Sequence, residues 1–399
     1  MNDTPRGERL HIALFGRRNA GKSSLINALT GQDTAIVSEI KGTTTDPVYK
    51  AMEIPPLGPV LFIDTPGLDD DGALGEQRAN KAKSILNKTD LALVVADGKE
   101  AEKDFRQEDD LIAWMQKKEI PYLIVFNKYD LWKDEVALPA ASYDIAVSAA
   151  TGFHIARLRE LLATKLSVND SKKTLVRDLL QPADVVVLVV PLDSSAPKGR
   201  IILPQQQVIR DVLEAGASAL VCRDTELSDT LMHLKDKPRL VITDSQAFST
   251  VADIVPQDVP LTSFSILFSR YKGNLAIQLA GIDAIRELEN GDCILIAEGC
   301  THHRRCEDIG TVKIPRWLHE FTKKEFRFET CSGNQFPSNL SPYRLVVHCG
   351  GCTLNQKEMA FRIAKCRDNH IPIVNYGILI AHLKGVLTRS LEPFFDKTN

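Results

Sequence analysis

The chain has 399 residues and a formal net charge of -3, and these two values already exclude several kinds of protein. A chain of this length exceeds what one hydrophobic core can hold, so two or three domains are expected. The charge gives no basic field that would gather nucleic acid or an anionic membrane. The polar N-terminus does not resemble a signal peptide, and no apolar run is long enough to span a bilayer. We therefore expect a cytoplasmic protein with no nucleic-acid or membrane partner.

Apolar strands alternate with helical patterns over residues 1–168. Strands are predicted at residues 10–15, 60–63, 91–95 and 122–126, with a helix at 22–29. This alternation is typical of an α/β domain, in which helices flank a mostly parallel sheet. The motifs that follow stand at the ends of these strands, where such folds place their functional loops.

The loop after the first strand matches the phosphate-binding pattern G-x-x-x-x-G-K-[ST]. In such a loop, backbone N–H groups and the N-terminus of the next helix face the phosphates. Lys22 is expected to neutralise the β- and γ-phosphates, and the Ser23 hydroxyl is expected to ligate Mg²⁺. Arg17 and Arg18 are interpreted as solvated loop residues. The residues predicted to bind the nucleotide in this loop are Gly16, Asn19, Ala20, Gly21, Lys22, Ser23 and Ser24.

The segment Asp64-Thr-Pro-Gly67 follows the strand at residues 60–63. This position places Asp64 at the carboxyl edge of the sheet, where a carboxylate supports the Mg²⁺ ion. The N–H group of Gly67 can meet the γ-phosphate. A loop that binds phosphate and a carboxylate beside Mg²⁺ together predict nucleotide hydrolysis.

The segment Asn127-Lys128-Tyr-Asp130 follows the strand at residues 122–126 and indicates which base is bound. Asp130 would accept hydrogen bonds from guanine N1–H and from the 2-amino group, a pair of donors that adenine lacks. Discrimination by such buried hydrogen bonds reaches about 10⁴-fold. Ser148 and Ala149 follow a further short strand and would close over the base. The motifs therefore predict a GTPase.

With these motifs, the first domain resembles the translation-factor-related GTPases, and in particular the TrmE/Era-like group of tRNA modification and ribosome assembly. The stretch Gly42-Thr-Thr-Thr-Asp46 is similar to that group's switch-I signature, which usually has Arg where this chain has Thr45. The resemblance implies Thr44 as a Mg²⁺ ligand and Asn19 as the ligand of an activating K⁺. Leu68 stands where signalling GTPases carry a glutamine that orients the attacking water. We therefore expect slow, K⁺-stimulated hydrolysis of GTP to GDP and phosphate, with Lys22, Thr44, Asp64 and Gly67 as catalytic residues.

A second α/β pattern runs from residue 174 to 262, after a polar stretch that reads as a linker. Strands are predicted at residues 184–190, 219–221 and 240–242, with helices between them. The only cysteine in this segment is Cys222, and no group of chemically active residues occurs in it. A structural or subunit-pairing role is therefore expected.

Seven of the eight cysteines lie from Cys293 to Cys366, in the third segment, at residues 263–399. Two groups, Cys300-Thr-His302 and His348-Cys349-Gly-Gly-Cys352, follow apolar strands. If these strands are neighbours in a parallel sheet, their carboxyl ends bring the three thiols together. A helix that starts near Asn355 would point its positive end toward an anionic cluster. The residues alone leave two metal sites open, an iron–sulfur cluster or a structural zinc site of the Cys₃His type.

The pattern C-x-H…H-C-x-x-C behind a GTPase resembles the HydF family of [FeFe]-hydrogenase maturation GTPases over the whole chain. The resemblance implies a GTPase domain at 1–168, a central dimerisation domain at 174–262 and an iron–sulfur cluster domain at 263–399. It implies a [4Fe-4S] cluster on Cys300, Cys349 and Cys352 with a labile fourth position. It also implies a homodimer or larger oligomer that takes up a transient diiron precursor assembled with two radical-SAM maturases and delivers it to apo-[FeFe]-hydrogenase.

The fourth cluster ligand and one alternative function stay open at this point. His302 or His348 is a candidate fourth ligand, although a histidine beside a metal more often supports the ligands by hydrogen bonding. Cys306 could compete for the same position. The alternative function is a ribosome- or RNA-associated assembly GTPase with a structural Cys₃His zinc site. The negative net charge and the lack of a basic stretch interleaved with aromatic residues speak against it.

Overall fold

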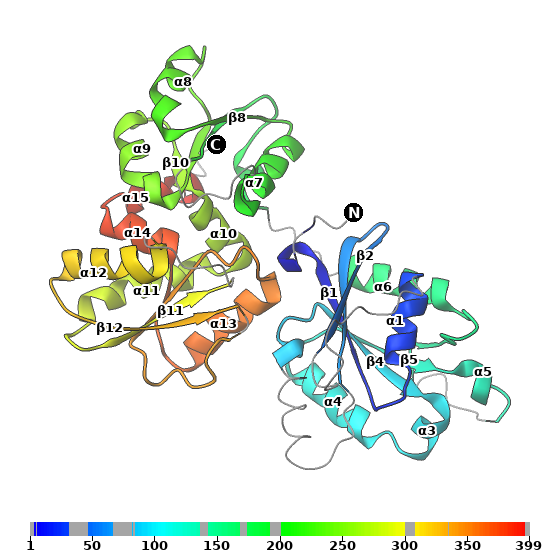
Figure 1. Cartoon of the computed structure of the whole chain (residues 1–399). Coiled ribbons are helices and arrows are strands. Elements are labelled where there is room, and N and C mark those ends of the chain that lie inside the picture. Colours follow the sequence, from blue (N-terminus) through cyan, green and yellow to red (C-terminus); the bar gives the residue numbers. More distant parts are fainter. Residues whose placement is uncertain are drawn as a thin grey trace. The chain divides into compact units, whose positions relative to one another are not determined.

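The structure is a computed structural model that describes residues 4, 6–31, 47–66, 82, 84–135, 143–167, 174–191, 201–299, 308–333 and 335–395. The chain forms two compact units, Met1–Ser171 and Lys172–Asn399 (Figure 1). The first unit contains one β-sheet, and the second contains two. In the described part of the chain, no helix combines the length and the apolar character needed to cross a membrane.

The sheet of the first unit has the strand order β2-β3-β1-β4-β5-β6, and all neighbours are parallel except β2 and β3. Its strands are β1 (Leu10–Phe15), β2 (Val48–Ile54), β3 (Gly58–Asp64), β4 (Leu91–Asp97), β5 (Tyr122–Asn127) and β6 (Ile145–Ala146). The helices are α1 (Lys22–Thr30), α3 (Gly98–Lys103), α4 (Arg106–Lys117), α5 (Tyr129–Trp132) and α6 (Ile155–Ser167). The central strand β4 is buried from Leu91 to Ala96, because helices cover both faces of the sheet.

The second unit contains two four-stranded parallel sheets with the same topology, which we call the middle sheet and the C-terminal sheet. The middle sheet has the order β10-β9-β7-β8, with β7 (Val185–Val189), β8 (Ser218–Cys222), β9 (Leu240–Thr243) and β10 (Leu261–Ser263). The C-terminal sheet has the order β12-β11-β13-β14, with β11 (Cys293–Glu298), β12 (Arg327–Ser332), β13 (Leu345–His348) and β14 (Ile373–Asn375). In each sheet the second strand lies on one side of the first strand and the third lies on the other. This reversal is a topological switch point at the carboxyl ends of the first and third strands, where α/β folds commonly bind ligands.

Helices connect and cover both sheets. They are α7 (Leu203–Glu214), α8 (Leu227–His233), α9 (Phe248–Ile254), α10 (Phe264–Lys272), α11 (Leu275–Glu287), α12 (Ile314–Thr322), α13 (Gln356–Asp368), α14 (Tyr376–Leu383) and α15 (Leu387–Phe395). A π-helical segment at Ile309–Lys313 leads into α12. The prediction of an α/β protein with three mostly parallel sheets is thus confirmed.

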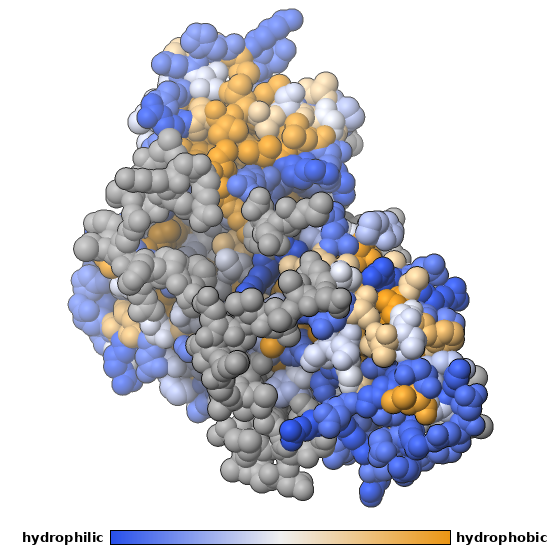
Figure 2. All heavy atoms as spheres, turned by 45° about the vertical axis from the view of Figure 1, so that its right-hand side comes forward, coloured by the Kyte–Doolittle hydropathy of each residue, from blue (hydrophilic) through white to orange (hydrophobic). Residues whose placement is uncertain are grey.

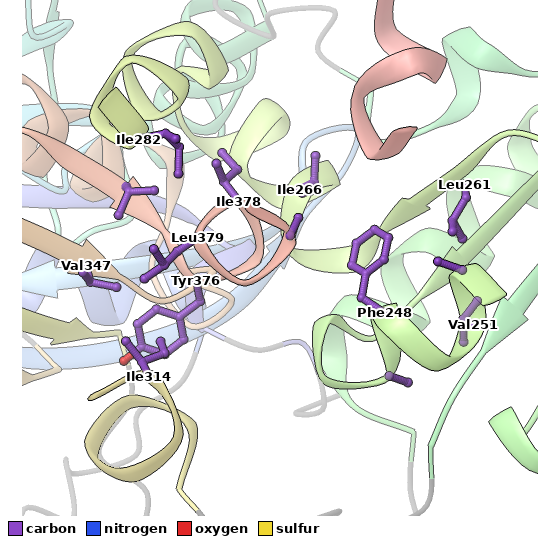
Figure 3. Close-up of a cluster of buried hydrophobic side chains, with 14 of the residues drawn as sticks. Phe248, Val251, Leu261, Ile266, Ile282, Ile314, Val347, Tyr376, Ile378 and Leu379 are labelled. Atoms are coloured by element: carbon purple, nitrogen blue, oxygen red, sulfur yellow. The ribbon is translucent and has the colours of Figure 1, made fainter. Parts of the chain in front are cut away.

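One hydrophobic core joins the two sheets of the second unit. Phe248 and Val251 of α9 belong to the same buried cluster as Ile378 of α14 and Val347 of β13 (Figure 3). Burial of such side chains contributes roughly 1.5–3 kcal/mol each. Because the cluster contains residues from both sheets, residues 172–399 pack as one unit.

Helix α10 forms the direct link from the middle sheet to the C-terminal sheet. The side chain of Ser263, the last residue of β10, caps the helix by accepting a hydrogen bond from the Ile266 amide. Phe264, Leu267 and Phe268 of α10 then pack into the core of the middle sheet. The helix ends at Lys272, and α11, which covers the C-terminal sheet, begins three residues later at Leu275.

Candidate functional site

The phosphate-binding loop runs from the end of β1 to the start of α1. Gly16 and Gly21 have φ values of 148° and 86°, which glycine adopts far more readily than other residues. A Cβ atom on Gly16 would lie 2.0 Å from the Val95 carbonyl oxygen, so the loop approaches β4 too closely for any side chain there. The ammonium of Lys22, which is only 7% exposed, donates to the carbonyl oxygens of Gly16 and Arg17 at 2.8 Å each. This lysine therefore closes the loop on itself, and phosphate oxygens would compete for the same protons.

Ser23 and Asp64 meet beside this loop. Residue Leu14 of β1 is paired with Asp64 of β3, which puts the end of β3 next to the start of the loop. The Ser23 hydroxyl donates to Asp64 Oδ2 at 2.5 Å. Burial raises the pKa of Asp64, while Ser23 and Lys22 act in the opposite direction. A hydroxyl and a carboxylate oxygen in contact are donors of the kind that Mg²⁺ binds. The predicted site residues Thr44 and Gly67, and Leu68, lie outside the described residues.

Asn127 ties the loops around the predicted guanine site together. Its side-chain amide donates to the Ala20 carbonyl at 3.1 Å, and its side-chain oxygen accepts from the Ala149 amide at 3.1 Å. The backbone at Lys128 is left-handed, with φ at 60°, and the Lys128 ammonium pairs with Asp97 at 2.9 Å. Asn127 thus holds the phosphate loop and the Ser148-Ala149 segment in one arrangement.

Asp130 and Ser148, the residues predicted to surround the base, are in direct contact. The Ser148 hydroxyl donates to Asp130 Oδ1 at 2.5 Å. The same hydroxyl oxygen accepts from the Thr151 amide at 3.1 Å, which fixes its orientation. One oxygen of the Asp130 carboxylate is therefore positioned by Ser148, in the way expected for a side chain that must face the edge of a base.

The interpretation of Arg17 as a solvated residue is wrong. Its guanidinium is half-buried and pairs with Glu108 at 3.1 Å and with Asp104 at 3.3 Å. Glu108 is itself buried, and this burial raises its pKa. The contact fastens the phosphate loop to the start of α4. Arg18, by contrast, is exposed.

The second group of predicted site residues lies at the carboxyl edge of the C-terminal sheet. Strands β11 and β13 are parallel neighbours, with Ala297 opposite His348. The two strands that precede the cysteine groups are thus parallel neighbours, as the predicted thiol site requires, and the loops after them leave the same edge of the sheet. They leave it at the switch point between the first and third strands of the sheet, where α/β folds commonly bind ligands. Cys300, His302 and Cys306 lie outside the described residues.

Amide groups converge on the sulfur of Cys349. Sγ accepts hydrogen bonds from the Gly299 amide at 3.0 Å and from the Gly351 amide at 3.4 Å. Gly351 has φ at 62°, and a Cβ atom there would lie 2.7 Å from the sulfur of Met359. Cys349 and Cys352 are both half-buried. Amide hydrogen bonds to sulfur favour a thiolate, the form that binds a metal. Among the described residues, which do not include 300–307, no group of three or more His, Cys, Asp or Glu residues is suited to hold a metal ion.

His348 is fully buried, and both of its ring nitrogens have protein partners. Arg362 lies 3.1 Å from Nε2, and because a guanidinium can only donate, Nε2 accepts. Nδ1 then carries the proton and donates to the Cys349 carbonyl oxygen at 2.7 Å. Burial, with a smaller effect of Arg362, lowers the pKa of His348 to about 3, so the ring is neutral. His348 could bind a metal only by giving up its bond to Arg362.

Arg362 is a site residue that the sequence reading missed. It is fully buried on α13, where its Nε donates to Glu358 at 2.9 Å and a terminal nitrogen donates to the Gly333 carbonyl at 2.5 Å. The only signal in the sequence was the Glu358–Arg362 spacing of four residues, which is common on exposed helix faces. The predicted helix start near Asn355 is confirmed, since the Asn355 side chain caps α13 by accepting from the Glu358 amide.

Three buried cysteines of the second unit have apolar surroundings. Cys293, Cys331 and Cys366 belong to one buried hydrophobic cluster between the C-terminal sheet and α13. Burial raises the pKa of Cys366 to about 12 and also raises the pKa values of the other two. These thiols are therefore protonated at neutral pH and serve as small apolar side chains.

The fold and the first site together define a class of protein. A phosphate-binding loop, a Ser–Asp pair beside it and an Asn-Lys-x-Asp loop lie at the ends of strands β1, β3 and β5 of one sheet. Residues 11–128 match the family profile of the 50S ribosome-binding GTPase. The first unit is therefore a P-loop GTPase, which binds GTP and GDP with Mg²⁺ and hydrolyses GTP.

Two further profiles identify the rest of the chain. Residues 175–273 match the hydrogen maturase F dimerization domain, and residues 275–393 match the hydrogen maturase F tetramerization domain. These two matches together cover more than half of the chain. The chain belongs to the hydrogen maturase F family, as its resemblance to the HydF family predicted. Both profiles describe oligomerization domains.

Individual relatives match over the extent of a GTPase domain. The tRNA modification GTPase MnmE of Xanthomonas oryzae pv. oryzae (strain PXO99A) is 40% identical over 171 residues, which are 40% of this chain and 36% of that protein. GTPase Der of Xanthomonas oryzae pv. oryzae (strain MAFF 311018) is 34% identical over 186 residues, which are 45% of this chain and 39% of that protein. The chain thus spans little more than a third of these relatives. The solved FeoB G-domain from Methanococcus jannaschii is 22% identical with a TM-score of 0.32, and the match covers 40% of this chain and 98% of that domain.

Proposed function

We propose that this protein is a GTP-hydrolysing scaffold that binds a [4Fe-4S] cluster and a diiron precursor and delivers the precursor to apo-[FeFe]-hydrogenase in the cytoplasm. The observation that carries the proposal is the loop of Cys349 and Cys352 at the carboxyl edge of the C-terminal sheet, hydrogen-bonded to Gly299, the residue that precedes Cys300 in the sequence. This loop lies in a chain of the hydrogen maturase F family. The partners that follow from the proposal are two radical-SAM maturases and the apo-hydrogenase.

The donor set fits an iron–sulfur cluster. The three cysteines would supply three thiolates, and the amides of Gly299 and Gly351 already point at one of these sulfurs. When bound, the cluster would supply a fourth, exchangeable iron position for an incoming complex. His348 is engaged on both ring nitrogens and is better suited to orient the loop through the Cys349 carbonyl. This leaves His302, Cys306 or an exogenous group for the fourth position.

In the nucleotide site, the proposed roles follow the contacts. Lys22 would exchange its loop carbonyls for phosphate oxygens, and Ser23, supported by Asp64, would hold the Mg²⁺ ion. Thr44 completes the Mg²⁺ site, Gly67 contacts the γ-phosphate and Asn19 binds K⁺. Hydrolysis is slow, because Leu68 cannot orient the attacking water. The domain assignment is GTPase at 1–168, dimerisation at 174–262 and cluster binding at 263–399.

The outer strand of the middle sheet, β8, is the surface through which two copies pair in this proposal. It is an edge strand whose residues Leu220 and Val221 are 38% and 45% exposed. Figure 2 shows apolar residues gathered over this part of the surface. An edge strand presents unpaired N–H and C=O groups that can pair with a second chain. This strand also lies within the residues that match the dimerization domain.

The test of pairing is Val221→Lys, which would place a charge in the middle of the paired edge. The molar mass measured by light scattering should fall from a multiple of the chain mass to that of a monomer. Leu131→Lys, at a 61% exposed position in the first unit, is the matched control and should leave the oligomer intact. A Val221→Lys protein that keeps the mass of the wild type would exclude β8 as the interface.

The test of the proposed function is the identity of the bound metal. The protein is purified without oxygen and reconstituted with iron and sulfide, and the reduced form is examined by visible absorption and EPR. The proposal requires about four irons and four sulfides per chain and an EPR signal of a reduced [4Fe-4S] cluster. A colourless protein that retains only zinc would favour the alternative, an RNA-associated assembly GTPase with a structural zinc site.

A further inference from the structure

A buried lysine lies under the cysteine loop. Lys272 is the last residue of α10 and is only 3% exposed. Its ammonium donates to the carbonyl oxygens of Leu354 at 2.8 Å, Cys352 at 3.0 Å and Gly351 at 3.3 Å. It also lies 5.4 Å from the centre of the Phe268 ring. An ammonium has three protons, and this loop offers an acceptor for each.

The contacts orient the carbonyl and amide groups of the loop toward different partners. Its carbonyl groups face the Lys272 ammonium, whereas the Gly351 amide faces the sulfur of Cys349. Gly351 takes part on both sides, because its carbonyl accepts from Lys272 while its amide donates to Sγ. A buried charge is costly unless it is matched by polar partners, so the loop cannot move away from Lys272 without a large penalty. The helix end at Lys272 also favours a cation there.

The lysine comes from a different part of the unit than the loop it holds. The first residues of α10, Phe264 and Phe268 among them, are packed in the core of the middle sheet. Lys272 lies inside the residues that match the dimerization domain, whereas Cys349 and Cys352 lie inside those that match the tetramerization domain. Through Lys272, the packing of α10 against the middle sheet therefore determines where the cysteine loop lies.

We propose that Lys272 is a positioning residue of the cysteine site, which holds the segment 351–354 in the conformation that presents Cys349 and Cys352 to the cluster. This inference rests on the proposed function of the loop in cluster binding. It adds a requirement that the cysteine motif does not contain, namely a cation supplied by α10, within the residues that match the dimerization-domain profile. It also adds a positive charge close to the two thiolates, which favours the bound anionic cluster.

The test compares Lys272→Met with Lys365→Met. Methionine keeps the length and the contact with Phe268 but cannot donate to the three carbonyls. Lys365 is the control, because it is a half-buried lysine of the same unit that donates to one carbonyl, that of Pro337 at 2.8 Å, outside the loop. Hydrogen exchange of the metal-free proteins is measured for the Gly351 and Leu354 amides. Iron release to a chelator is measured for the reconstituted proteins.

In Lys272→Met, exchange in the segment 349–354 should rise by about tenfold or more and iron release should accelerate by a similar factor, because buried carbonyls lose their partner. Lys365→Met should match the wild type in both measurements. Equal exchange and equal iron release in the two variants would overturn the proposal. If the wild type binds no cluster, the proposed function fails, while the exchange data still decide whether Lys272 holds the loop.

A variant that keeps the charge covers the case in which Lys272→Met does not fold. In Lys272→Arg, the planar guanidinium retains the positive charge but cannot donate to all three carbonyls in the same geometry. Exchange in the segment 349–354 should lie between the values of the wild type and those expected for Lys272→Met. Exchange as slow as that of the wild type at both Gly351 and Leu354 would then count against the proposal.

Discussion

Each compact unit holds its functional loop with a buried lysine, but the two lysines come from different places. Lys22 binds the carbonyls of Gly16 and Arg17, six and five residues before it in the same motif. Lys272 binds the carbonyls of Gly351, Cys352 and Leu354, from 79 to 82 residues after it. Lys22 can exchange carbonyl oxygens for phosphate oxygens as the ligand arrives, because both lie next to its own helix. Lys272 instead connects two sheets, so its contacts fix a loop relative to a distant element.

The two sites differ in how many of their groups lie within one sequence motif. The phosphate loop contains its ligand groups, its cation and its glycines within eight consecutive residues. The cysteine loop contains thiols and glycines, but its cation comes from α10 and its supporting arginine, Arg362, comes from α13. The first site therefore depends on local geometry, and the second depends on how the unit folds.

The largest expected effect is a complete loss of cluster binding with no change in GTP hydrolysis. The triple change Cys300→Ala, Cys349→Ala and Cys352→Ala should abolish cluster binding, because no thiolate remains, and should leave GTP hydrolysis unchanged. Iron content and phosphate release are measured on the same preparation. Cys222→Ala is the control, since this half-buried thiol lies at the end of β8 in the middle sheet, and it should retain its iron. Loss of GTP hydrolysis in the triple variant would show that the two units do not act independently.

Lys22→Ala should have the opposite effect. Hydrolysis of GTP should fall by roughly 10²- to 10³-fold, because the ammonium that neutralises phosphate charge is removed. The cluster content should stay at the wild-type value. Lys103→Ala, which removes an exposed lysine in a surface ion pair with Glu100, should hydrolyse GTP at the normal rate. A Lys22→Ala protein that lost its iron would contradict the separation of the sites.

Asp130→Asn tests the assignment of the base. The variant loses the carboxylate that accepts from two guanine donors, so the affinity for GTP should fall by about 10²-fold or more. Binding is measured by calorimetry with GTP and with xanthosine triphosphate, whose 2-carbonyl group replaces the amino group of guanine. The ratio of the two affinities should shift toward xanthosine triphosphate. Asp134→Asn, at an exposed position four residues away, should leave this ratio unchanged.

Asn19→Gly has the smallest expected effect. Glycine tolerates the left-handed backbone at this position, where φ is 62°, so the change removes the side-chain amide without straining the backbone. Stimulation of hydrolysis by K⁺ over Na⁺ should disappear, while the rate in Na⁺ should stay the same. The rates are compared at equal ionic strength. If the variant keeps its preference for K⁺, Asn19 is not the potassium ligand.

Much of the fold could be predicted because its signals are local. Strands such as β4 and β13 are short apolar runs that end at polar motifs, and these patterns indicate buried parallel strands. The edge strands β2 and β12 were not predicted. In β12, Arg327, Glu329 and Thr330 are exposed, so the strand has no continuous apolar run that would reveal it. Edge strands with such polar sequences are recognised by their pairing, which sequence periodicity does not contain.

The same limit applies to the sites. The Ser23–Asp64 contact was expected, because both residues belong to motifs that follow neighbouring strands. The contact of Arg17 with Glu108 was not expected, because the two residues are 91 positions apart and Glu108 belongs to no motif. Lys272 and Arg362 were missed for the same reason, since a lysine or an arginine on a helix is usually solvated. Only the tertiary structure shows that these two are buried and which groups they bind.

The most direct test of the account is transfer to the hydrogenase. The protein is produced together with the two radical-SAM maturases, purified without oxygen and mixed with apo-[FeFe]-hydrogenase, and hydrogen evolution is then measured. We expect activity to appear only with protein that carries Cys300, Cys349 and Cys352, and not with the triple alanine variant. An apo-hydrogenase that stays inactive with the loaded wild type, or that is activated equally by the triple variant, would contradict the role of a cluster scaffold and carrier.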